Sequence, residues 1–128
     1  MNRLKILGII FSFVIFLSCN HDDGSSQELD ALKLDQLYSE IEKIANSVTC
    51  TNSTEWTFTS YGSKACGGPV GYIAYSINID TVLFLEKIEA LRIAQQKFNE
   101  KWGIMSDCSI PQEPSGVACE NGIAVLQY

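Results

Sequence analysis

The sequence predicts a small α+β domain in which two helices pack on one face of a small antiparallel sheet, supported by two disulfides. Three features of the 128-residue chain lead to this fold class: two segments with helical periodicity, strand-like runs between and after them, and four cysteines beyond the N-terminal region. Elements in this order form a layered α+β structure. A chain of this length holds one domain with a modest core, which we expect over residues 28–128.

The first helix is expected from about Glu28 to Ser47. Charged residues such as Glu40 and Lys43 lie opposite a set of apolar residues spaced by three and four: Leu34, Leu37, Ile41, Ile44 and Val48. This spacing is typical of an amphipathic helix with one buried face.

Two strands are expected next. Residues 56–59 alternate apolar and polar side chains, which places Trp56 and Phe58 on one face. Residues 70–77 are apolar on both faces, as in a central strand. The sequence therefore predicts a pair of strands between the two helices.

The second helix is expected to start at an N-cap, Asn78 or Asp80, and to end at Gly103. Its apolar stripe is interrupted only at Gln95 and consists of Phe84, Ile88, Leu91, Phe98 and Trp102. An aromatic stripe at helical spacing is typical of a core-facing surface.

A hairpin is expected at the end of the chain. Residues 117–120 and 123–126 flank Asn121-Gly122, and both of these turn residues tolerate positive φ. The strands and the hairpin together complete the predicted sheet.

The first 18 residues have the parts of a secretory signal peptide. Arg3 and Lys5 precede an apolar segment over residues 6–16. A helix of that length rises about 16 Å, roughly half the hydrocarbon thickness of a bilayer. We therefore expect residues 1–18 to be a removed signal rather than a membrane span.

The end of this signal, Phe16-Leu17-Ser18-Cys19, resembles the lipobox of bacterial lipoproteins. The resemblance implies that Cys19 is lipidated, becomes the first mature residue and anchors the protein to the membrane. Ordinary cleavage or a retained anchor is the alternative. Lipidation of Cys19 would also leave four cysteines, an even number that can form two disulfides. These cysteines are Cys50, Cys66, Cys108 and Cys119.

Residues 19–27 are polar and predict a flexible tether. Within it, Asp22-Asp23 resembles the surface-export signal of some Gram-negative lineages, although a solvated acidic linker has the same composition. We therefore expect a lipid-anchored protein of the outer membrane that faces either the periplasm or the cell surface.

The four cysteines allow three pairings. We expect Cys50–Cys66 and Cys108–Cys119, because each closes a short loop around a turn-rich segment. A crossed arrangement such as Cys50–Cys119 stays open. Each disulfide would contribute about 2–4 kcal/mol to the free energy of unfolding.

The mature chain is acidic. Once residues 1–18 are removed, seven basic residues stand against 15 acidic ones, a formal net charge of −8. This charge disfavours nucleic acid as a partner.

The composition also predicts that the protein is not an enzyme and that it holds no cofactor or metal. His21 is the only histidine and lies in the tether, and the cysteines lack CxxC spacing. Carboxylates such as Glu55 and Asp80 are scattered rather than paired.

Residues 60–69 have the most unusual composition of the chain, with three glycines, a proline and a cysteine. They predict either a tight structural connection or a rigid recognition loop. The candidate contact residues are Ser63, Lys64, Ala65, Gly67, Gly68 and Pro69. In a second interpretation Lys64-Ala65 enters a protease cleft as an inhibitor.

Tyrosines offer a further candidate surface. Tyr61, Tyr72, Tyr75 and Tyr128 form either a sugar-binding platform or, as we expect, part of the packing on the sheet.

Trp56, the segment 62–69 and Ser106-Asp107-Cys108 resemble small cysteine-containing exported lipoproteins of bacteria whose function is unassigned. The resemblance brings no catalytic residues. The expected function is therefore a membrane-anchored, non-enzymatic binding or interaction lipoprotein with an unknown protein or glycan partner, and the alternative is a protease inhibitor.

Overall fold

The computed structural model describes residues 26–128. The predicted signal peptide and lipidation site at Cys19, together with His21 and Asp22-Asp23, lie outside the described residues. The elements follow the order α1 (Gln27–Ala45), η1 (Ser53–Glu55), β1 (Trp56–Tyr61), β2 (Gly71–Ser76), α2 (Thr81–Trp102), β3 (Gly116–Glu120) and β4 (Ile123–Gln127).

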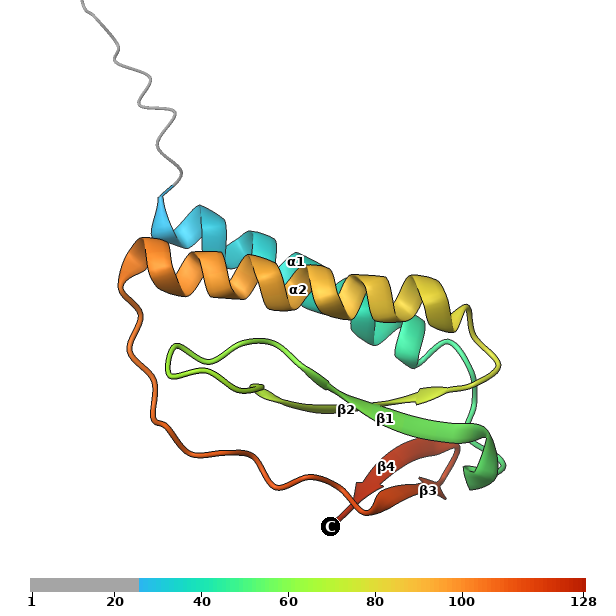
Figure 1. Ribbon diagram of the computed structural model, residues 1–128. Helices are drawn as coiled ribbons and strands as arrows, with labels where there is room; N and C mark the ends of the chain where they lie inside the picture. Colours follow the sequence, from blue (N-terminus) through green and yellow to red (C-terminus); the bar gives the residue numbers. More distant parts are fainter. Residues whose placement is uncertain (1–25) are drawn as a thin grey trace, which may run out of the picture.

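The α+β fold class is confirmed. Helices α1 and α2 run side by side over the β1–β2 hairpin, and the β3–β4 hairpin lies below it (Figure 1). The strands form two separate two-stranded antiparallel sheets, β1–β2 and β3–β4, instead of one continuous sheet. The second hairpin contacts the first through β1·β3 and β2·β4, so it adds a further layer below the first hairpin.

Both helices begin after an N-cap residue, and α2 ends at a glycine. The Ser26 hydroxyl caps α1 by accepting a hydrogen bond from the Leu29 amide at 3.2 Å, so α1 starts one residue earlier than predicted. Asp80 is the N-cap of α2 and accepts from the Leu83 amide at 3.0 Å. Gly103 ends α2 with a left-handed φ of 59°, which glycine adopts without strain.

The core lies between the two helices and the upper face of the first hairpin. Phe84 of α2 and Ile41 of α1 are fully buried, and Tyr61, Ile73 and Tyr75 pack against this cluster from the strands. The rings of Tyr75 and Phe84 are 4.6 Å apart. Tyr61 and Tyr75 therefore pack on the sheet, as the sequence led us to expect.

The lower face of the first hairpin is aromatic. Strand register pairs Trp56 with Ser76 and Phe58 with Ala74, which places Trp56 and Phe58 on one face as predicted. Trp56 is only 9 % exposed, and the Phe58 and Tyr72 rings meet edge to face at 6.0 Å. This face points away from the helices, because Tyr61 and Tyr75 occupy the alternate positions.

Two disulfides are present, but the preferred pairing of Cys50 with Cys66 and Cys108 with Cys119 was wrong. The bonds are Cys50–Cys119 and Cys66–Cys108. The fold brings the segment between α1 and η1 against the turn of the second hairpin, where the Cys50 amide donates to the Gly122 carbonyl at 2.9 Å. Loop length alone is therefore a poor guide to the pairing, because tertiary contacts bring together cysteines that are far apart in the sequence.

The hairpin turn is confirmed. Asn121 and Gly122 both have positive φ, 51° and 81°, as a tight two-residue turn requires. In the part of the chain that the structure describes, neither helix is long and apolar enough to cross a membrane.

Candidate functional site

Hydrogen bonds between its own backbone groups close the loop that joins β1 to β2. The Lys64 amide donates to the Gly68 carbonyl and the Gly67 amide donates to the Lys64 carbonyl, both at 2.9 Å. Gly67 and Gly68 have φ values of 89° and 81°, which permit this reversal of the chain. The loop therefore has a defined shape before any partner arrives.

Gly62 allows the loop to lie against α2. Its φ is 75°, and a Cβ at this position would stand 2.6 Å from Gln95 Oε1 and 2.8 Å from Val70 Cγ2. Gln95 uses the same oxygen to accept a hydrogen bond from the Ser63 amide at 2.9 Å. Asn99 donates to the Ser63 carbonyl at 2.8 Å. The interruption of the apolar stripe at Gln95 thus serves to hold this loop.

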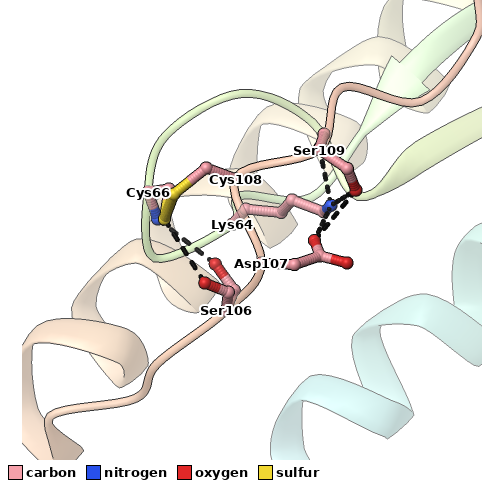
Figure 2. Close-up of a disulfide and its surroundings, with 6 residues drawn as sticks. All are labelled: Lys64, Cys66, Ser106, Asp107, Cys108 and Ser109. Atoms are coloured by element: carbon pink, nitrogen blue, oxygen red, sulfur yellow. Dashed lines mark hydrogen bonds and ion pairs between the residues drawn. A yellow bond between two sulfur atoms is a disulfide. The ribbon is translucent and has the colours of Figure 1, made fainter.

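A covalent bond holds the far side of the loop to the segment that follows α2. The Cys66–Cys108 disulfide joins the two, and the Cys66 amide donates to the Ser106 hydroxyl at 3.3 Å (Figure 2). The loop is therefore fixed on one side by α2 and on the other by residues 106–108.

Lys64 points toward this same segment. Its ammonium donates to Asp107 Oδ1 at 2.6 Å and to the Ser109 carbonyl at 2.7 Å (Figure 2). The Lys64 side chain is only 17 % exposed. Its charge therefore joins two segments of the protein instead of projecting into solvent.

A polar pocket of about 350 Å³ lies between the loop and α2. Of the predicted contact residues, Pro69 is the one that does not line it. The remaining lining residues come from α2 and the segment after it, and the sequence reasoning did not identify them. The lining residues are Ser63, Lys64, Ala65, Gly67, Gly68, Arg92, Gln96, Asn99, Glu100 and Ile104.

The helical wall of the pocket is pre-arranged by its own contacts. Arg92 makes a two-point ion pair with Glu89 at 2.7 and 2.8 Å, and Gln96 donates to Glu100 at 3.2 Å. These amide, guanidinium and carboxylate groups present hydrogen-bond donors and acceptors to one space. The arrangement suits recognition of a polar ligand. Among residues 26–128, no group of three His, Cys, Asp or Glu side chains is placed to hold a metal ion.

The contact between Lys64 and Asp107 predicts a pH dependence. Hydrogen bonds from Lys64 and Ser109 hold the pKa of Asp107 below its ordinary value. A carboxyl group whose pKa is lowered by folding stabilises the fold fully at pH values above the ordinary Asp pKa of about 4. It loses that contribution as the pH falls through the lowered pKa. In an NMR titration, we expect Lys64→Met to raise the Asp107 midpoint, while Lys43→Met leaves it unchanged. Equal midpoints in the wild type and Lys64→Met would contradict this contact.

Comparisons of this chain with protein-family models, with curated proteins and with solved structures found no match.

Proposed function

We propose that the protein is a membrane-anchored lipoprotein that binds a polar partner, without catalysis, in the pocket between the β1–β2 loop and α2. Its signal peptide is residues 1–18, and a lipid on Cys19 holds it in the outer membrane, facing the periplasm or the cell surface. The lipobox-like segment before Cys19 supports the anchor. The partner is a protein segment or a glycan.

The pre-formed loop is the observation that carries this proposal. A disulfide, an ion pair and contacts from two helical amides fix residues 63–68 in one shape. Ordering a flexible loop on binding costs about 0.5–1.5 kcal/mol for each immobilised side chain, and a loop already fixed avoids much of that cost. The polar lining then favours a partner rich in hydrogen-bonding groups.

The position of Lys64 favours this binding function over protease inhibition. An inhibitor that used Lys64-Ala65 would present the lysine to the cleft of a trypsin-like enzyme. Here the Lys64 ammonium has three oxygen partners, on Asp107 and Ser109, at 2.6 to 3.1 Å. Entry into a cleft would break these contacts.

Site-specific photo-crosslinking in intact cells tests the proposed site. A photoreactive residue is placed at Ala65, which is exposed and lines the pocket, or at Glu86, which is exposed elsewhere on α2. We expect a discrete crosslinked product from position 65 that is absent from position 86. The product should fall at least tenfold when Arg92→Ala and Asn99→Ala are added. Identical products from both positions, or none from position 65, would argue against a binding site here.

A further inference from the structure

A second hollow lies elsewhere on the domain, bounded by α1, β2 and β4. It measures about 440 Å³, and its lining residues are Tyr38, Glu42, Ala45, Asn46, Tyr72, Ile73, Ala74, Ala124, Val125, Leu126 and Tyr128. None of these residues lines the pocket described above. We call this hollow the α1–β2 groove.

One wall of the α1–β2 groove is the free edge of β2. Of the strands in the described part of the chain, β1 is the one that pairs with β2. The Ile77 amide donates to the Glu55 carbonyl at 2.9 Å. In an antiparallel pair, residues whose backbone groups bond to the partner strand alternate with residues whose backbone groups point away from it. In this register, the backbone groups of Ile73 and Tyr75 therefore bond to β1. Tyr72 and Ala74 therefore direct their backbone N–H and C=O groups away from β1, toward the groove that they line.

This edge lacks the usual protection against pairing with another strand. Natural edge strands carry charged residues, proline or bulges that block such pairing. Strand β2 reads Gly-Tyr-Ile-Ala-Tyr-Ser over its six residues, with neither a charge nor a proline. The edge is instead recessed between α1 and β4. A whole folded domain would meet α1 and β4 first, whereas a single extended chain is narrow enough to reach β2.

The charge of the groove indicates what kind of chain it takes. Among the described residues that line the groove, Glu42 alone has a charged side chain. Within residues 26–128, no basic side chain forms an ion pair with Glu42. The opposite side of the groove is apolar, with Val125 and Leu126 of β4. An acidic wall faces an apolar wall, and successive residues of an extended strand point to opposite sides.

We propose that the α1–β2 groove binds an extended peptide in which basic and apolar residues alternate. The peptide adds to β2 as a further strand, through the outward backbone groups of Tyr72 and Ala74. Its basic side chains face Glu42, and its apolar side chains face β4. Main-chain bonds at a free strand edge provide affinity in this mode of recognition, and alternate side chains provide specificity. This site is separate from the pocket beside α2 and does not depend on the proposed function.

The test uses the full-length chain in detergent, labelled with ¹⁵N, and the peptide acetyl-Lys-Val-Lys-Val-Lys-amide as the probe. We expect saturable amide shifts at Tyr72, Ala74 and Glu42, with the residues 62–70 unaffected. Ala74→Pro should weaken binding at least tenfold, because it removes one outward N–H and spares the bonds to β1. Glu42→Gln should weaken it about threefold by removing the charge, while the matched change Glu86→Gln should have no effect.

Two N-methylated peptides give a test that needs no variant of the protein. One carries methyl groups on the valine amides and the other on the lysine amides. A peptide added at the free edge of β2 pairs with β2 through only one of its own two edges, so one methylated peptide should lose binding and the other should retain it. Equal binding of both peptides would overturn strand addition. The proposal would also fail if 5 mM parent peptide shifted no groove amide, or if only a chitotriose probe shifted Tyr72 and Tyr128, which would indicate a glycan site.

Discussion

A Cys50→Ala/Cys119→Ala variant should lose about 4 kcal/mol of its free energy of unfolding. The bond between these cysteines joins residues 69 positions apart. Closing so long a loop restricts the unfolded chain by about 4 kcal/mol in the chain-entropy model. Cys50 is 2 % exposed, so the substitution also leaves space in the interior. A small domain has about 5–15 kcal/mol in total, so this variant should be close to unfolding.

Urea denaturation followed by tryptophan fluorescence would measure this loss. The matched control is Cys66→Ala/Cys108→Ala, which opens a separation of 42 residues between exposed cysteines. The chain-entropy model assigns the control a similar loss, also about 4 kcal/mol. Under conditions in which both variants stay folded, only the control should reduce the crosslink from position 65, because its bond holds the β1–β2 loop. A loss below about 1 kcal/mol in the Cys50/Cys119 variant would show that this bond contributes little to stability.

Cys19→Ser should remove the protein from the membrane fraction. Each buried methylene of a lipid contributes about 0.8 kcal/mol, and stable anchoring takes more than one acyl chain. Among the described residues, no helix is long and apolar enough to hold the protein in the membrane in place of a lipid. We therefore expect wild-type cells to incorporate an alkyne-labelled fatty acid into the protein, and we expect the serine variant to incorporate none.

Ser18→Ala is the matched control for this change, because it keeps a small residue before the cysteine. It should be labelled and should sediment with membranes like the wild type. Equal membrane association of the wild type and Cys19→Ser would count against lipidation and would leave a retained anchor as the alternative.

Local signals in the sequence predicted the elements well. The Asp80 cap, the Gly103 stop and the Asn121-Gly122 turn act over three or four residues, and each occurs in the structure. The period of the apolar residues placed Ile41 and Phe84 in the core. These features depend on neighbours in the chain, which is why the sequence alone was sufficient to identify them.

Long-range features were harder to predict. The pairing of Cys50 with Cys119 depends on the contact between the segment after α1 and the second hairpin, and no local pattern encodes that contact. The division of the strands into two separate hairpins also depends on contacts between residues that are far apart in the sequence. Arg92 and Asn99 lie outside the apolar stripe of α2 and carry no motif, so the sequence did not identify the half of the candidate pocket that comes from α2 and the segment after it. Gln95 was the available clue, since a polar residue within an apolar stripe requires a partner.

The two disulfides are nested, with Cys66–Cys108 inside the loop closed by Cys50–Cys119. Because synthesis starts at the N-terminus, Cys50 and Cys66 are made before their native partners, Cys119 and Cys108. Oxidation at that stage joins two neighbours that must later separate, and release of a wrong bond proceeds by thiolate attack through a mixed disulfide. Such reshuffling takes seconds to hours, depending on the oxidant and the isomerase. Efficient maturation thus favours a compartment that can rearrange disulfides as well as form them.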